Sequence, residues 1–154
     1  MLPDSAEVDD GRLIVGGCDV ADLAREFGTP LFVYDEEHLR VRCREAVSAF
    51  GPDVAYASKA FLCTAMARLV HEEGMRIDVS TGGEMYVALH AGVPPERIVF
   101  HGNNKSTAEI EVALGHGVGR IVLDSWDEID RIEALVESGA AAPSVLLLSL
   151  IHIS

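Results

Sequence analysis

A strand-like run followed by a helical pattern recurs through the middle of the chain, and this repeat constrains the fold more than any other feature. The runs begin about 22 residues apart, and in each helical segment apolar residues return every three or four positions. Most of the helical segments end in Gly, which is typical of a helix terminus. The apolar runs are DVAYAS (53–58), MRIDVS (75–80), RIVFHG (97–102), RIVLDS (120–125) and SVLLLS (144–149).

The starts of three helical segments carry the same short motif. Thr81-x-x-Glu84, Ser106-x-x-Glu109 and Ser125-x-x-Glu128 each match a capping box. In that motif the hydroxyl and the carboxylate together satisfy free backbone amides of the first turn. The sequence therefore predicts a strand, a capped helix and a Gly stop, repeated along the chain.

Repeated strand–helix units build a parallel sheet with helices outside it, either as an open doubly wound sheet or as a closed barrel. The near-constant spacing, without a long connection, favours the barrel. A whole (β/α)8 barrel needs about 250 residues, whereas this chain has 154 and shows five strands of the barrel type. We therefore expect an α/β protein that forms only the first half of a (β/α)8 TIM barrel.

A different pattern precedes the repeat. RLIV (12–15) predicts a strand and DVADLAREFG (19–28) a helix, and TPLFVYD (29–35) predicts another strand. EEHLRVRCREAVSAFG (36–51) predicts a long amphipathic helix that packs outside the barrel just before its first strand.

Polar residues stand at the carboxyl ends of the predicted strands, where parallel folds bind their ligands. They are Ser58-Lys59, Asp78 to Ser80, His101-Gly102-Asn103 and Asp124-Ser125. The amino-terminal ends carry ordinary solubilising residues, namely Asp53, Arg76, Arg97 and Arg120. This difference predicts a site at one end of the sheet.

Lys59 is the residue of that site most suited to a chemical role. It closes the otherwise apolar stretch VAYASKA (54–60) and is either a surface side chain or an amine held in a partly dry mouth. In the second case its pKa falls and the amine becomes a usable nucleophile, able to form a Schiff base with an aldehyde such as pyridoxal phosphate.

Four segments give this hypothesis a family: VAYASKAF, IDVSTGGEM, AGVPPERIVFHGNNKS and VLDSWDEIDRI. They resemble the diaminopimelate decarboxylases, which belong to the alanine-racemase-like class of pyridoxal-phosphate enzymes. The resemblance runs from about Gly28 to about Leu147, and HGNNKS after PPERIVF separates it from the ornithine and arginine decarboxylases. It implies a pyridoxal-phosphate barrel with an additional β-sandwich domain, a homodimer, and decarboxylation of meso-2,6-diaminopimelate to L-lysine and CO2.

The resemblance also implies roles for individual residues. Lys59 matches the Schiff-base lysine, Ala57 would line the cofactor, and Asp78 matches an aspartate near the lysine and the ring. His101 and Asn103 match the HGN segment, and Glu84 the acidic residue of the GGE turn.

Structural explanations compete with several of these roles. Asp78 could equally serve as a loop cap, and Glu84 is better explained by the capping box. His101 could be a satisfied histidine at a strand end, and Asn103 a turn residue.

Composition limits the function further. Lys and Arg number 12 against 25 Asp and Glu, and the formal net charge of −13 argues against nucleic acid as a partner. The first residues, MLPDSAEVDDG, lack the basic-then-apolar pattern of a secretory signal, and no apolar run reaches the roughly 20 residues needed to cross a membrane. The cysteines Cys18, Cys43 and Cys63 are odd in number and widely spaced, which predicts neither disulfides nor a metal site and favours the cytoplasm.

These observations predict three segments. Residues 1–35 would contribute to the β-sandwich of a full protein, residues 36–148 form a partial pyridoxal-phosphate barrel, and residues 149–154 (SLIHIS) read as a non-native tail on a truncated chain. The half barrel leaves an open sheet edge, so we expect the chain alone to be inactive.

Three other functions are weighed against this one. A non-catalytic pyridoxal-phosphate carrier barrel also holds its cofactor on a strand-end lysine, but lacks the GGE and HGNNKS segments. A related amino-acid decarboxylase of the ornithine or arginine type shares the barrel. An open-sheet nucleotide-binding or regulatory domain requires a Gly-rich loop after the first strand, and SKAFLC is not one.

Overall fold

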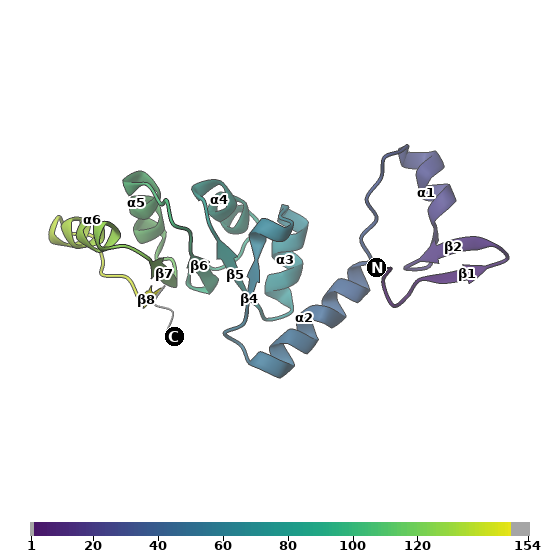
Figure 1. Ribbon diagram of the computed structural model, residues 1–154, viewed down its shortest axis with the longest axis horizontal. Coiled ribbons are helices and arrows are strands. Elements are labelled where there is room, and N and C mark those ends of the chain that lie inside the picture. The colour runs from purple at the N-terminus through teal and green to yellow at the C-terminus, as the bar shows by residue number, and fades with distance from the viewer. Residues whose placement is uncertain (1, 149–154) are drawn as a thin grey trace, which may run out of the picture.

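The computed structural model describes residues 2–148 of the chain. Two groups of elements are visible in Figure 1, a small antiparallel sheet near the N-terminus and a larger parallel sheet with its helices, joined by one long helix. The larger group contains the predicted repeat and all candidate site residues.

Five parallel strands form the larger sheet, in the order β4-β5-β6-β7-β8. Neighbours in the sheet are also neighbours in the sequence, as in a barrel, and each of the five predicted runs contains one strand. The sheet is the first half of a (β/α)8 barrel, as the sequence predicts. The strands are β4 (Ala55–Ala57), β5 (Arg76–Val79), β6 (Ile98–Phe100), β7 (Arg120–Leu123) and β8 (Val145–Leu147).

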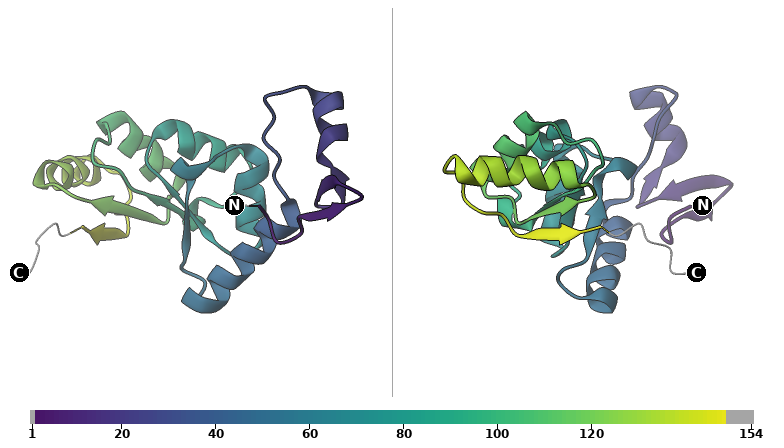
Figure 2. Two further views of the ribbon diagram at one scale, coloured as in Figure 1. Left: turned by 45° about the vertical axis from the view of Figure 1, so that its right-hand side comes forward. Right: turned by 60° about the vertical axis from the view of Figure 1, so that its left-hand side comes forward.

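Helices alternate with these strands and lie together on one face of the sheet (Figure 2). They bury a single apolar core against it, which includes Ile77, Phe100 and Ile121. The helices are α3 (Thr64–Glu72), α4 (Gly82–His90), α5 (Thr107–His116) and α6 (Trp126–Glu137), with short 3₁₀ turns η1 (Ser58–Ala60) and η2 (Pro95–Arg97). A helix follows each of the first four strands of the sheet, as the repeat predicts.

The register of the strands decides which side chains face away from the helices. Ile77 lies beside Tyr56 and Ile98, and these helix-facing residues belong to or border the core. Because side chains alternate along a strand, their neighbours Ala57, Asp78 and Val99 point to the opposite face. That face would line the interior of a closed barrel, so Ala57 and Asp78 point towards the expected site.

The small N-terminal sheet contains two strands that were not predicted from the sequence, β1 (Glu7–Asp9) and the two-residue β3 (Cys18–Asp19). Its third strand is β2 (Arg12–Val15), and the sheet is followed by α1 (Val20–Phe27). Asp10 and Gly11, at φ +46° and +75°, form the turn between β1 and β2. An Asp-Gly pair between strands is a strong hairpin signal, so β1 could have been predicted.

The predicted strand at residues 29–35 is wrong. These residues form no strand and join α1 to α2 (Glu36–Phe50), which is the predicted long helix. A strand requires a neighbour with which to exchange backbone hydrogen bonds, and neither described sheet includes this segment. Apolar composition alone therefore did not make it a strand.

Two of the three predicted capping boxes are complete. Thr81 with Glu84 and Ser106 with Glu109 each form both hydrogen bonds of the motif. At α6 only half of it is present: the Ser125 hydroxyl accepts from the Glu128 N–H, but the Glu128 carboxylate accepts instead from the N–H of Asp124 at 3.2 Å.

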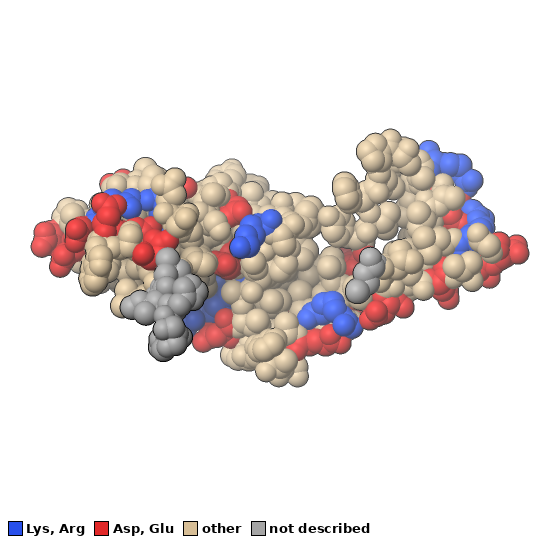
Figure 3. All heavy atoms as spheres, in the orientation of Figure 1, with Lys and Arg blue, Asp and Glu red and all other residues tan. Residues whose placement is uncertain are grey.

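Within residues 2–148, β4 and β8 each pair with one strand only, so the sheet has two open edges. Figure 3 shows acidic side chains gathered over α6 at one end of the molecule and over the β1–β2 hairpin at the other. The described helices include none that is long and apolar enough to span a bilayer. The predicted tail, 149–154, lies outside the described residues.

Candidate functional site

Lys59 lies at the carboxyl end of β4, where the strand passes into η1. Its side chain is exposed, so the partly dry mouth expected around this amine is not formed by the described residues. The reason is geometric, because the five strands enclose the mouth on one side only. The amine is accessible to a ligand, and no described residue forms an ion pair with it.

Asp78 faces the same interior side from the end of β5, in register with Ala57. Its Oδ2 lies 3.6 Å from Nδ1 of His101, at the end of β6, which is too long for a hydrogen bond but close enough for a charge interaction if the imidazole is protonated. Burial raises the pKa of the Asp78 carboxyl, and the charges of His101 and Lys59 act in the opposite direction. The three predicted residues therefore influence one another electrostatically.

Two buried oxygen atoms in this region have no hydrogen-bond partner. They are Oδ1 of Asp78 and Oγ of Ser58, and buried polar atoms in native proteins are nearly always paired. Beside them stands the small, half-buried side chain of Ala57. An accessible amine, an unpaired carboxylate oxygen and a small neighbouring side chain fit the aldehyde and ring of pyridoxal phosphate.

Carboxylates occupy part of the starts of α4 and α5. Free amides at a helix start are a common phosphate site, and here several of the amides at or just before those starts are already used. Glu84 accepts from the N–H groups of Ser80 and Thr81, and Glu109 accepts from those of Ser106 and Gly82. Glu84 therefore serves as the capping residue of α4, the first of the two roles considered for it, the other being the acidic residue of the GGE turn.

The loop after β6 is confined more tightly than its sequence indicates. Asn103, predicted from the HGN segment, is exposed and shows no contact with Asp78 or Lys59 among the side-chain hydrogen bonds of the structure. Gly102 has φ +110°, and a Cβ atom there would lie 2.8 Å from the carbonyl oxygen of Ser80. Only glycine fits this close approach, a constraint that the sequence pattern does not reveal.

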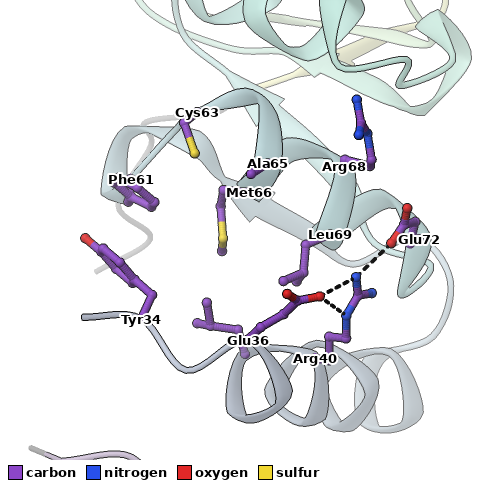
Figure 4. A pocket seen from close by; sticks show the side chains of 11 residues that line it. Tyr34, Glu36, Arg40, Phe61, Cys63, Ala65, Met66, Arg68, Leu69 and Glu72 are labelled. Carbon is purple, nitrogen blue, oxygen red and sulfur yellow. Dashed lines mark hydrogen bonds and ion pairs between the residues drawn. The ribbon is translucent and has the colours of Figure 1, made fainter. Parts of the chain in front are cut away.

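A separate hollow of about 400 Å³ lies between α2 and α3 (Figure 4). Tyr34 and Phe61 stack at one side of it, with ring centroids 4.6 Å apart. Met66 and Leu69 point towards α2, and Arg40 pairs with Glu36 and Glu72, each at 2.9 Å. Its lining contains neither Lys59, Asp78 nor His101, so it is not the predicted site.

Comparison with known proteins agrees with this geometry. Residues 36–150 match the family model of the pyridoxal-dependent decarboxylases, pyridoxal binding domain. The diaminopimelate decarboxylase of Mycobacterium leprae is 53% identical over 139 residues, which cover 89% of this chain and 29% of the relative. The chain thus spans about a third of the length of the curated relatives that it matches.

Solved structures give the same result. The diaminopimelate decarboxylase of M. jannaschii, in co-complex with L-lysine, superposes with a TM-score of 0.88 at 35% identity, over 96% of this chain and 36% of that one. A lysine/ornithine decarboxylase from Vibrio vulnificus, complexed with putrescine, has a TM-score of 0.73 at 25% identity, over 83% of this chain and 34% of that one. The cofactor implied by the matched domain is pyridoxal phosphate. With most of its length matched by the family model, this chain belongs to the pyridoxal-dependent decarboxylases.

Proposed function

We propose that this chain is the lysine-bearing part of a diaminopimelate decarboxylase, which converts meso-2,6-diaminopimelate to L-lysine and CO2. In that reaction one carbon–carbon bond breaks at the D-centre, CO2 leaves, and a proton takes its place on the same carbon. The observation that carries the proposal is the accessible amine of Lys59 next to the inward-facing Asp78, in a chain 53% identical to the M. leprae decarboxylase.

Pyridoxal phosphate, when bound, supplies an aldehyde that bonds to amines and a ring that withdraws electrons from the bond that breaks. In this chain Lys59 would hold the aldehyde, and Ala57 leaves space for the ring. Asp78, in register with Ala57, offers an unpaired oxygen atom to the same region. Because carboxylates already use several amides at the starts of α4 and α5, we place the phosphate elsewhere in the whole protein.

Asp78 would act on the amine of Lys59 electrostatically. Its carboxyl is half-buried, and burial raises its pKa, while the positive charge of Lys59 favours the ionised form. An ionised Asp78 would in turn help to orient the amine. His101 lies 3.6 Å from the same carboxylate and, when protonated, would also interact with its negative charge.

The experiment uses a hybrid protein in which this chain replaces the segment that it matches in the M. leprae enzyme. We expect the hybrid to release CO2 from meso-2,6-diaminopimelate, and its Lys59→Ala variant to lose this activity completely. A hybrid that binds pyridoxal phosphate yet decarboxylates ornithine in preference would contradict the proposed substrate. One that binds the cofactor and turns over neither substrate would support a carrier instead.

We further propose that the whole protein is a cytoplasmic homodimer that acts on a small amino acid. The support is the family likeness together with three free cysteines, which suit a reducing compartment. We also propose that residues 1–35 belong to a β-sandwich domain and that the 154-residue chain alone is inactive. Sedimentation of the hybrid tests the dimer, and an assay of the chain alone tests the last point.

A further inference from the structure

Lys105 and Glu128 are fully buried, although charged side chains rarely are. Their side chains are 0% and 1% exposed, and Nζ of Lys105 lies 2.8 Å from Oε1 of Glu128. The contact is one of charge rather than an aligned hydrogen bond. A buried ion pair is poor at increasing stability, because removing two charges from water offsets their attraction. Its presence here therefore needs another explanation.

Each partner of the pair also holds the backbone of a loop. The Lys105 ammonium donates a hydrogen bond to the carbonyl oxygen of Gly102, in the loop after β6. The Glu128 carboxylate accepts from the N–H of Asp124, in the loop after β7. The Lys105–Glu128 pair thus connects the carboxyl ends of two neighbouring strands.

The third capping box, at α6, is incomplete where the Lys105–Glu128 pair forms. At α4 and α5 the glutamate at the same position turns back onto the N-cap residue of its own helix. Glu84 also accepts from Ser80, the residue before its N-cap. Glu128 keeps only the equivalent contact, with the N–H of Asp124, and its other oxygen contacts Lys105. The Glu128 carboxylate is therefore shared between the start of its own helix and the loop that carries Lys105.

The loop so held carries a site residue. The backbone of Gly102 is confined on one side by the carbonyl of Ser80 and on the other by Lys105. The adjoining residue, His101, donates its backbone N–H to Val79 at 2.8 Å and places its ring 3.6 Å from Asp78. Releasing Gly102 would free the backbone next to that ring.

We propose that Lys105 and Glu128 are positioning residues that fix the loop at 101–105, so that His101 faces Asp78 beside Lys59. The inference deepens the proposed function, since the placement matters for catalysis only if Lys59 carries the cofactor. The placement itself can be measured without cofactor or substrate.

The test compares the hybrid with its Lys105→Met and Lys105→Met/Glu128→Leu variants. Losing one partner leaves an uncompensated buried charge and should lower the urea midpoint of unfolding. Replacing both by apolar residues of similar size should restore the midpoint. In the double variant without cofactor, we expect hydrogen exchange of the amides at 101–105 to become about tenfold faster, as for the loss of one hydrogen bond. The control, Asp53→Asn, breaks ion pairs with Arg76 and Arg120 at the opposite strand ends and should leave that exchange unchanged.

Turnover supplies the second measurement. We expect kcat of the double variant to fall about tenfold with KM within about twofold, because the lost loop contact is one hydrogen bond and binding contacts elsewhere are unaltered. A double variant with unchanged exchange and kcat would overturn the proposal, and so would one that fails to recover the urea midpoint, since the pair would then act on stability. Faster exchange in a hybrid that has no decarboxylase activity would leave the positioning intact and refute the proposed function.

Discussion

Gly102→Ala tests the packing of the site loop. It adds one methyl group at a position where backbone strain and crowding by a neighbouring carbonyl both act. The residue has φ +110°, and the new Cβ would lie 2.8 Å from the Ser80 carbonyl oxygen, closer than real Cβ contacts. A side chain at positive φ costs roughly 1–2 kcal/mol. Overpacking against a neighbour that must shift costs roughly 1–3 kcal/mol. We therefore expect Gly102→Ala to lower the free energy of unfolding by about 2–5 kcal/mol.

Two other glycines separate the two effects. Gly92 has φ +88° and open space around it, so Gly92→Ala should cost only the strain, about 1–2 kcal/mol. Gly119 has no positive φ, but its Cβ would meet the carbonyl of Glu96 at the amino-terminal ends of the strands, so Gly119→Ala should show crowding alone. Urea unfolding of the three hybrid variants, followed by circular dichroism, measures these differences.

The same variants also locate the site. Gly102→Ala should slow the attachment of pyridoxal phosphate to Lys59, whereas Gly119→Ala, at the other end of the strands, should not. If Gly102→Ala is no more destabilising than Gly92→Ala, the close approach to Ser80 is not real. If both crowded variants slow attachment equally, the site does not depend on the carboxyl ends of the strands.

Three further changes have defined outcomes. Burial raises the pKa of Asp78 above its usual 3.8, so the folded state binds this proton more tightly than the unfolded state. The stability of the folded protein therefore falls as the pH rises above 3.8. Asp78→Asn should therefore raise the urea midpoint at pH 7, by an amount that shrinks as pH approaches 3.8, while it lowers turnover; no gain at pH 7 would contradict this sign. Lys59→Arg keeps the positive charge but should lose borohydride-trapped cofactor as fully as Lys59→Ala, which mass spectrometry checks. Ser106→Ala removes the cap of α5 and should cost about 1 kcal/mol in urea unfolding, with little effect on Lys59.

The half barrel could be predicted from the repeat, because the hydrophobic periods of strands and helices differ and each unit carries its own start and stop signals. The carboxyl strand ends followed directly from that alternation, which is why Lys59, Asp78 and His101 could be named from sequence. The segment at 29–35 failed for the opposite reason. Its residues have strand propensity, but pairing depends on a neighbour that propensity does not reveal.

The burial of Lys105 and Glu128 could not be predicted in the same way. A lysine in a polar loop such as HGNNKS is ordinarily exposed, and Glu128 fitted the capping box as well as Glu84 did. Only the packing of α6 against the loop after β6 distinguishes them. The exposure of Lys59 likewise depends on how much of the barrel surrounds it, which no local pattern contains.

The central claim is that Lys59 is the amine that binds the cofactor. The hybrid is incubated with pyridoxal phosphate, reduced with borohydride, digested, and its peptides are mapped by mass spectrometry. The account predicts one reduced pyridoxyl adduct within this chain, on Lys59, and none on Lys105. An adduct elsewhere in the chain with Lys59 unmodified would contradict it.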